Sequence, residues 1–485
     1  MCPLDAARTA HSMNDRLPST VESALHPLVI DLDGTLCRTD TLWENFFAAW
    51  RACWWLPLVA PLWLVAGRSR LKARLAATTL PSINSLPWNA AVIGAINVAR
   101  ADGRLCILAT AANERIATAC AAELGLFDEV MASSDGVNLK GSAKADRLVA
   151  KYGVAGFDYI GDSRADLPVW SVAAKKISAS NLIPPGGEPL AEASKAGSVG
   201  AWIRLLRVRH WVKNVLVFVA LFAAHSWSSA AGWLAATATF FAFCAVCSGV
   251  YVLNDLFDLA SDRAHPSKCK RPLACGELSL AQAFLVSLVL LVLGIAIAWA
   301  TAPSVAAIML IYVAINALYT ARFKRVPVVD VFCLAGLYTL RIVAGAAAVK
   351  VPLSTWLVAF SVFAFLSLAL LKRAADLARL SPHEMLPGRG YAGRDAAFVN
   401  GFGVSSAMAA CVVLSLYVAS DQVASMYAAP LWLWGWVVVV LLWLARMWHL
   451  AMNGSMDDDP VLFATRDTVS WGCAAVIAGC VLLAI

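Results

Sequence analysis

Long apolar runs in the second part of the chain are the feature that most constrains its fold. From about residue 212 onward the sequence consists mostly of apolar runs separated by short polar loops. A run of about 17 to 25 apolar residues can cross the hydrocarbon core of a bilayer as a helix. The pattern predicts nine transmembrane helices, at about 212–229, 233–253, 280–300, 303–321, 329–349, 354–371, 400–420, 429–446 and 467–485. This part is therefore expected to be an all-α membrane bundle.

The first 200 residues have a different pattern, in which charged and apolar segments alternate as they do in a soluble α/β domain. The segment 181–200 is rich in Pro, Gly, Ala and Ser, which is typical of a linker. Residues 1–26 contain acids and lack a long apolar core, so we expect no signal peptide. The expected domains are a tail at 1–26, an α/β domain at 27–180 with a helical cap at about 38–98, the linker at 181–200 and a transmembrane domain at 201–485.

Basic residues gather in alternate loops of the predicted bundle. One set of loops contains Arg263, Lys268, Lys270, Arg271, Arg322, Lys324, Arg325, Lys372, Arg373, Arg379, Arg389, Arg394, Arg446 and Arg466, whereas the opposite loops contain Lys350. Because loops rich in Lys and Arg stay on the cytoplasmic side, we expect an inner-membrane protein whose α/β domain and active sites face the cytoplasm. The same loops account for the net charge of +7, so we expect no nucleic-acid partner.

The segment NDLFDLASD, residues 254–262, follows the second predicted span. If the helix continues, Asn254, Asp258 and Asp262 lie on one face, with Asp255 beside Asp258. Acids packed in this way repel one another unless a cation neutralises them, and oxygen ligands suit Mg²⁺, which often bridges to substrate phosphates. The basic stretch HPSKCKRP follows at once. The pattern predicts a magnesium–diphosphate site, and the alternative is a solvated loop with ordinary surface acids.

The strings NDLFDLASD and RPLACGELS resemble the first aspartate-rich motif of the UbiA superfamily of intramembrane prenyltransferases. That resemblance implies a nine-helix bundle whose active site opens to the cytoplasm. Three further segments, at 207–214, 262–268 and 319–331, resemble the branch that transfers a phosphoribosyl group from phosphoribosyl diphosphate to a polyprenyl phosphate such as decaprenyl phosphate. The alternative is an aromatic prenyltransferase that uses a prenyl diphosphate. Many aromatic prenyltransferases carry an aspartate pair after a later span, but this pair is not evident here, and the loop after the fourth span is basic.

The resemblance also assigns roles to residues of the transmembrane domain. Mg²⁺ is expected on Asn254, Asp255, Asp258 and Asp262, with Asp258 catalytic. Residues expected to bind the anionic substrates are Lys213, Asn214, Lys268, Arg271, Tyr319, Lys324, Arg325 and Arg341. For each basic residue taken alone, a topology signal is the alternative. Arg341 lies inside an apolar span, where a charge is costly, so we expect a functional role or an ion pair, with Asp330 as a possible partner.

Three short apolar segments of the first domain end in polar residues. Leu28 to Ile30 leads into DLDGT at 31–35, RLCILAT ends at Thr110, and FDYIGD ends at Asp162. Open α/β sheets bind their ligands at the carboxyl ends of the strands. We therefore expect a site where these polar residues meet.

This set of motifs, completed by GDSRAD at 161–166, resembles the haloacid dehalogenase-like (HAD) phosphohydrolase superfamily. The resemblance implies that Asp31 is the nucleophile, that Asp33 is the general acid and base, and that Thr110 holds a phosphoryl oxygen. Mg²⁺ is expected on Asp31, Asp33, Asp162 and Asp166, and the motif lysine is Lys144 or Lys140. The alternative is a degenerate domain of the same fold without turnover.

The apolar segment 46–67 contains two prolines and is short for a span. It is expected to be a cap element at the membrane surface, and a buried cap core is the alternative. Together, the two resemblances predict an enzyme that attaches phosphoribose to a polyprenyl phosphate and then removes the 5-phosphate. The product, polyprenyl-phosphoryl ribose, would be a precursor of arabinose donors for cell-envelope glycans. No signal in the sequence indicates an oligomeric state.

Overall fold

The computed structural model describes residues 26–134, 138–190, 197–456 and 459–485. Nearly all of the predicted tail, 1–25, and the linker residues 191–196 lie outside the described residues. The chain packs as two compact units. The first consists of Met1–Leu206 and Tyr251–Ser287, and the second of Arg207–Val250 and Leu288–Ile485. Residues 251–287, predicted as part of the transmembrane domain, therefore pack with the α/β domain.

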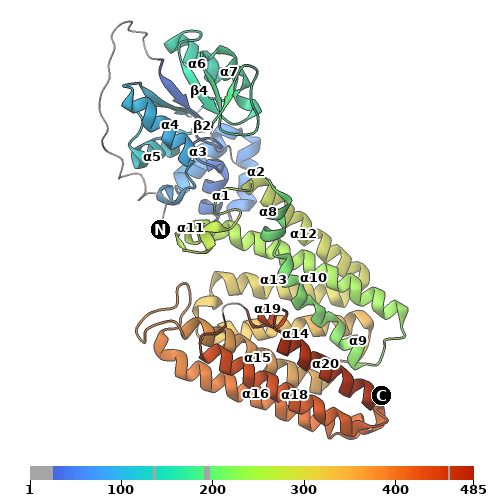
Figure 1. Ribbon diagram of the computed structural model, residues 1–485. Helices are drawn as coiled ribbons and strands as arrows, with labels where there is room; N and C mark the ends of the chain where they lie inside the picture. Colours follow the sequence, from blue (N-terminus) through green and yellow to red (C-terminus); the bar gives the residue numbers. More distant parts are fainter. Residues whose placement is uncertain (1–25, 135–137, 191–196, 457–458) are drawn as a thin grey trace. The chain divides into compact units, whose positions relative to one another are not determined.

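The first unit contains a six-stranded parallel sheet with the strand order β3-β2-β1-β4-β5-β6 (Figure 1). The strands are β1 (Leu28–Ile30), β2 (Cys106–Asn113), β3 (Glu129–Ser133), β4 (Asp158–Gly161), β5 (Lys176–Ser178) and β6 (Glu188–Pro189). Their apolar runs arise because central parallel strands are covered on both faces. The three predicted strands are β1, β2 and β4, and the predicted α/β class is confirmed.

Helices cover both faces of this sheet, and successive strand residues point to opposite sides. Ile30 and Leu108 pack against α4 and α5, whereas Val29 and Ile107 pack against α6 and α7. The bounds are α4 (Ala90–Ala101), α5 (Glu114–Leu124), α6 (Ser142–Tyr152) and α7 (Leu167–Val172). This layering brings the carboxyl ends of β1, β2 and β4 together at one edge.

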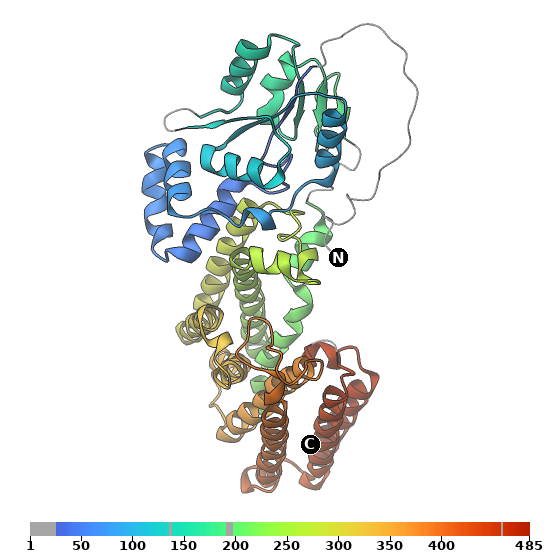
Figure 2. The same ribbon diagram turned by 90° about the vertical axis from the view of Figure 1, so that its left-hand side faces the viewer.

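Three cap helices follow β1 and lie beside the sheet (Figure 2). They are α1 (Thr41–Ala52), α2 (Leu56–Val65) and α3 (Arg68–Thr78), followed by a 3₁₀ turn at Ile83–Ser85. Along α2, Leu58 and Leu62 are 73% and 68% exposed, and only Leu56 and Ala60 are buried. Leu56 and Ala60 belong to a small buried cap core with Ala49, Leu71 and Leu75, so α2 buries one side in the cap and exposes the other.

The aspartate-rich segment packs on the first cap helix. Phe47 of α1 shares an apolar cluster with Leu256, Leu273 and Leu278, and with Leu205 of α8. The bounds in this region are α8 (Val199–Leu205), α10 (Ala230–Phe257), α11 (Leu259–Ala264), a 3₁₀ turn at Lys268–Lys270 and α12 (Leu280–Thr301). The segment is thus held by hydrophobic contacts with the α/β domain.

The second unit is a helical bundle. Its core is formed mainly by α14, α15, α16 and α18, whose ribbons run beside one another in Figures 1 and 2. The long helices are α13 (Pro303–Ala321), α14 (Val329–Val349), α15 (Thr355–Leu377), α16 (Ala396–Val418), α18 (Leu433–Met452) and α20 (Thr468–Ala484). Shorter elements are 3₁₀ helices at Val208–Phe218, Phe323–Arg325, Gly393–Asp395 and Pro430–Trp432, and α9 (Val219–Ala223), α17 (Asp421–Met426) and α19 (Pro460–Ala464).

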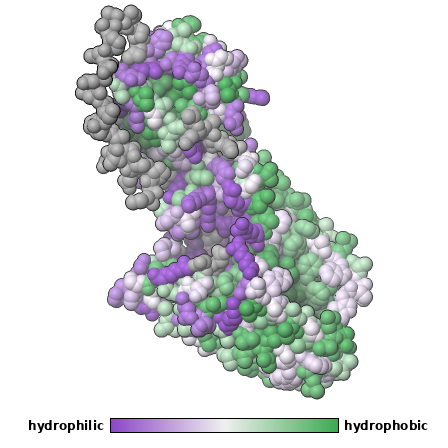
Figure 3. All heavy atoms as spheres, in the orientation of Figure 1, coloured by the Kyte–Doolittle hydropathy of each residue, from purple (hydrophilic) through white to green (hydrophobic). Residues whose placement is uncertain are grey.

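Seven helices in the described part of the chain are long and apolar enough to cross a membrane, so the predicted count of nine is not confirmed. They are Ala230–Phe257, Leu280–Thr301, Pro303–Ala321, Val329–Val349, Thr355–Leu377, Gly393–Val418 and Pro430–Met452. Apolar side chains cover broad areas of the helical part in Figure 3, and Val292 and Trp299 of α12 are among those exposed.

The two remaining predicted spans differ from the expectation in length. The stretch 212–229 forms a 3₁₀ helix that ends at Phe218 and the five-residue α9, and α20 has 17 residues. Near the start of the first stretch, Lys213 and Asn214 are buried and bind polar partners. The carbonyl of Val217 also approaches α14 so closely that a Cβ on Gly345 would lie 1.9 Å from it.

Candidate active sites

Three carboxylates meet at the carboxyl edge of the sheet. Asp31 follows β1, Asp162 follows β4, and Asp166 ends the 3₁₀ turn Arg164–Asp166. Each offers one oxygen, and these oxygens lie within 4.8 Å of one another. Among the residues that the structure describes, no other group of three His, Cys, Asp or Glu side chains is gathered in this way. The fourth predicted ligand, Asp33, lies outside this group.

Lys144 is the lysine that pairs with the first carboxylate. Its buried Nζ lies 2.8 Å from Oδ1 of Asp31, whereas Lys140 is exposed. The same Nζ donates to the hydroxyl of Tyr159, and that hydroxyl donates to Oδ1 of Asp166 at 2.7 Å. Tyr159 is a site residue that the sequence analysis missed, because an aromatic residue in a buried strand looks like core packing. Lys144 and Tyr159 together fix two of the three clustered carboxylates.

The turn after β1 requires a glycine. Gly34 has φ +78°, and a Cβ there would lie 2.3 Å from Oδ2 of Asp162. The neighbouring Thr35 hydroxyl donates to Oδ1 of Asp162 at 3.4 Å. Thr110 is fully buried in β2, and its hydroxyl accepts from the amide of Ala112 at 3.0 Å. The DGT sequence therefore lets the backbone pass directly beside Asp162.

Burial makes these carboxylates reluctant to ionise. It raises the pKa of Asp31 to about 7, of Asp33 to about 6 and of Asp162 to about 8, and the neighbouring acids add to the effect. Burial also lowers the pKa of Lys144, but Asp31 and Asp166 together outweigh it, so its pKa is raised and it stays charged. A divalent cation such as Mg²⁺ stabilises the ionised form of neighbouring buried carboxylates, and it prefers oxygen ligands. These three carboxylates therefore fit a magnesium site.

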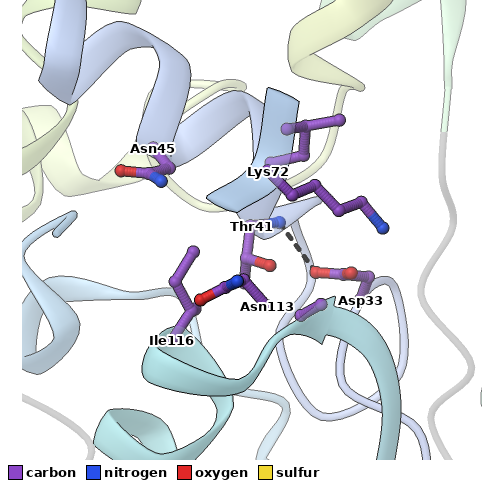
Figure 4. Close-up of a pocket in the computed structure, with 8 residues that line it drawn as sticks. Asp33, Thr41, Asn45, Lys72, Asn113 and Ile116 are labelled. Carbon is purple, nitrogen blue, oxygen red and sulfur yellow. Dashed lines mark hydrogen bonds between the residues drawn. The ribbon is translucent and has the colours of Figure 1, made fainter. Parts of the chain in front are cut away.

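Asp33 lies at a small pocket between the sheet and the cap (Figure 4). Its Oδ1 accepts from the amide of Thr41 at 2.7 Å. Lys72 of α3 reaches towards Asp33 in Figure 4, and its Nζ donates to the carbonyl of Ala111 at 2.6 Å. Burial lowers the pKa of Lys72. This lysine was not predicted as a site residue, since RSRLKARL contains several basic residues that the sequence alone does not distinguish.

The aspartate-rich segment contains an ion-paired cluster. A single residue, Asp258, separates α10 from α11, but its amide still donates to the carbonyl of Asn254 at 2.9 Å, and the amide of Asp262 donates to the carbonyl of Asp258 at 2.8 Å. Asp255 and Asp262 converge on one guanidinium nitrogen of Arg271, at 3.0 and 2.6 Å. Arg271 was predicted to bind substrate, and here it neutralises two of the predicted ligands. Lys268 is exposed on the turn that follows.

Arg263 joins this segment to the cap. Its guanidinium makes two hydrogen bonds to the carboxylate of Glu44, one of 3.1 Å and one of 2.5 Å. The hydroxyl of Thr39 donates to Glu44 at 2.7 Å, and Nε of Arg263 donates to the carbonyl of Ala274 at 2.9 Å. The Arg263 and Glu44 side chains are 8% and 4% exposed. The sequence analysis treated Arg263 only as a topology signal.

In the second unit, Arg341 lies among polar and aromatic side chains. Its Nε donates to Oδ1 of Asn214 at 2.8 Å, and an NH2 group donates to the hydroxyl of Tyr312 at 3.0 Å. The expected pairing with Asp330 is wrong. Asp330 precedes Arg341 by eleven residues, roughly 16 Å along a helix, and it binds Arg373 at 2.8 Å instead.

Other predicted residues of this unit are distributed over two clusters. Lys213 pairs with Asp459 at 2.6 Å, and Lys372 approaches the same carboxylate oxygen at 3.5 Å. Separately, the hydroxyl of Tyr319 accepts from Arg389 and Arg373. Lys324 and Arg325 lie on the 3₁₀ turn after α13. Residues missed here are Tyr312, Lys372, Arg389 and Asp459, and for Asp459 the only signal was the acid run that it ends.

The chain combines a parallel sheet that has carboxylates at one edge with a set of long apolar helices. The chain belongs to the UbiA prenyltransferase family, whose family model matches residues 215–483. Residues 28–171 match the family model of haloacid dehalogenase-like hydrolases. Both resemblances are confirmed. The described residues include seven helices long and apolar enough to cross a membrane, and the chain is an integral membrane protein that joins a transferase family to a hydrolase family.

Three relatives show how far the similarity extends. The chain is 37% identical over 470 residues to an uncharacterized protein, y4nM, of Sinorhizobium fredii, and the match covers 94% of this chain and 91% of that protein. It is 39% identical over 278 residues to the nodulation protein NoeC of Azorhizobium caulinodans, covering 56% and 89%. It is 34% identical over 186 residues to decaprenyl-phosphate phosphoribosyltransferase of Mycobacterium tuberculosis, covering 38% and 62%.

Proposed function

We propose that this chain transfers a 5-phosphoribosyl group from phosphoribosyl diphosphate to a polyprenyl phosphate and then removes the 5-phosphate. The transfer step is supported by the similarity to decaprenyl-phosphate phosphoribosyltransferase. A lipid phosphate oxygen attacks the anomeric carbon, and the bond to pyrophosphate breaks as pyrophosphate leaves with the electron pair. A phosphomonoester is mostly ionised at neutral pH, so this attack needs no strong general base.

The protein's main task in the transfer is to hold two anionic substrates and to stabilise the departing pyrophosphate. We assign Asn254, Asp255, Asp258 and Asp262 to a magnesium–diphosphate site. We assign the phosphates to Lys213, Asn214, Lys268, Arg271, Tyr319, Lys324, Arg325 and Arg341. Because Asp255 and Asp262 now share Arg271, binding of Mg²⁺ would free this guanidinium for the diphosphate.

The pairing of Lys144 with Asp31 beside Asp162 and Asp166 carries the proposal of a phosphatase step. The Asp31 carboxylate attacks the phosphorus, and the ribose oxygen leaves with a proton from Asp33. Asp33 then takes a proton from the water that hydrolyses the aspartyl-phosphate. Thr110 binds a phosphoryl oxygen, and Lys144 favours the ionised form of Asp31, against the burial that raises the pKa of this carboxyl. Asp31 and Asp162 would hold Mg²⁺, with Asp166 as support, and the cation would neutralise the phosphate charge.

Joining the two activities in one chain gives the second site an advantage. If both sites face the cytoplasm, as the basic loops predict, the phosphorylated lipid stays in the same membrane as the phosphatase. Tethering of this kind raises the effective concentration of the second substrate. The transfer comes first and the dephosphorylation second, because phosphoribosyl diphosphate brings in the 5-phosphate that the second site removes.

Membranes that contain this protein are expected to move label from phosphoribosyl diphosphate into a lipid when decaprenyl phosphate is added. Replacing Asp258 by Asn should lower this transfer by up to about 100-fold, because a ligand for the diphosphate's cation loses its charge. Lipid extraction and counting measure the effect. Asp421→Asn, which changes an exposed acid at the start of α17, should match the wild type. Product formed only from a prenyl diphosphate and an aromatic acid would contradict the proposal.

Lys72 is expected to assist the phosphatase from the cap. Replacing it by Met should lower the kcat/KM of dephosphorylation by roughly 10 to 100-fold, the range for a lost charge-assisted hydrogen bond. Phosphate release from the purified protein measures the effect. Arg70→Met serves as the matched control, since Arg70 is exposed on the same helix. Equal losses in both variants would assign the effect to the general charge of α3.

A further inference from the structure

A cavity of about 930 Å³ lies over the carboxylate site of the first unit. One part of its wall is polar and contains Asp31, Lys144 and Asp162. Sites for drug-sized ligands occupy roughly 300–1,000 Å³, so this cavity is at the large end of that range. A ribose phosphate bound at the carboxylates would fill only a part of it.

The remaining wall is largely apolar and comes from the cap helices α1, α2 and α3 and from the segment after the aspartate motif. Helix α2 contributes Ala60, Pro61 and Leu64, and the later segment contributes Leu278 and Phe284 beside the charged Glu277. The exposed apolar face of α2, with Leu58 and Leu62, continues outside the cavity. A phosphate-binding end and an apolar extension in one cavity match a ligand that has a phosphate at one end and a hydrocarbon chain at the other.

We infer that this cavity binds a phosphomonoester carried on an isoprenoid lipid. The phosphate lies at Asp31 and Lys144, and the first isoprene units contact Leu64 of α2 and Phe284 of α12. The phosphatase then selects a lipid-linked phosphate over a free sugar phosphate. This inference rests on the proposed phosphatase function and adds the residues that set its specificity.

The experiment compares two substrates on the purified full-length protein in detergent. One is a synthetic farnesyl-phosphoryl ribose 5-phosphate and the other is ribose 5-phosphate. The wild type is expected to prefer the lipid probe, and Leu64→Gln should lower the ratio of the two kcat/KM values about tenfold, because an apolar contact is lost. Leu58→Gln changes a leucine of the same helix that does not line the cavity, so its ratio should stay at the wild-type value. A thermal melt checks that each variant is folded.

The outcomes separate the inference from the function on which it rests. Hydrolysis of both probes with equal efficiency would overturn the lipid site while the phosphatase function stands. Hydrolysis of neither probe would overturn the phosphatase function and the inference with it. Equal loss of preference in both leucine variants would overturn the cavity assignment and indicate that the outer face of α2 contacts the micelle. A change in elution volume with either variant would assign this face to a second copy of the chain.

Discussion

Replacing Asp31 by Asn is expected to stop dephosphorylation, with a loss of roughly 10⁴-fold or more, because an amide does not act as the nucleophile. The lipid product should then keep its 5-phosphate and accumulate. The substitution keeps the size of the side chain and removes a carboxyl group whose pKa burial raises to about 7, so the fold should tolerate it. A mass spectrum of the extracted lipids distinguishes the two products by the mass of one phosphate.

Two comparisons make this result specific. Total incorporation of labelled pentose into lipid should be the same in Asp31→Asn as in the wild type, because the transfer step does not use this residue. Asp146→Asn, which changes an exposed acid of the helix that contains Lys144, should give the wild-type product. Dephosphorylated lipid at the wild-type level in Asp31→Asn would show that another site or another enzyme removes the phosphate.

Replacing Arg263 by Ala is expected to destabilise the first unit by about 3–5 kcal/mol, the usual cost of leaving one buried charge without its partner. The Glu44 carboxylate would lose both hydrogen bonds from Arg263. In the described part of the chain, the hydrogen bond from the hydroxyl of Thr39 would remain. The loss should appear as a lower melting temperature and as faster amide hydrogen exchange in α1 and α11. Both helices bear a residue of the pair, so both should open more often.

A double variant tests whether the charge is the cause. Glu44→Leu combined with Arg263→Met removes both charges, and it should recover most of the lost stability. Lys175→Ala breaks an ion pair with Glu188 in which the side chains are 51% and 65% exposed, so it should melt like the wild type. A melting temperature unchanged in Arg263→Ala would mean that the packing around Phe47 alone holds the two segments together.

The sequence predicted the sheet and the long helices because burial leaves a direct signal in the order of residues. Central strands such as β1 and β4 are apolar on both faces, and each ends in the acids DLD or GD that mark the site. The choice between Lys140 and Lys144 was left open, since both follow β3 at short range. In the structure, Lys144 lies on α6 and its side chain reaches Asp31, whereas Lys140 precedes this helix.

The polar contacts of the membrane helices were harder to predict. A basic residue at the end of an apolar span can indicate topology, bind a substrate or pair with an acid far along the chain, and the sequence alone does not distinguish these roles. Arg373, counted as a topology signal, is buried against Asp330. The pairing of Asp255 and Asp262 with Arg271 was also not predicted, because Arg271 was expected to bind a substrate phosphate.

The shared packing of residues 251–287 with the α/β domain has a consequence for how this gene could be divided or recombined. The match to the UbiA family begins at residue 215, yet a stretch well inside it completes the apolar cluster around Phe47 and a wall of the cavity over Asp31 and Lys144. The region that matches the UbiA family and the helical unit that packs as one compact body therefore consist of different residues. If the α/β domain were exchanged at the boundary between the two family matches, it would be separated from residues 251–287, which complete its hydrophobic packing.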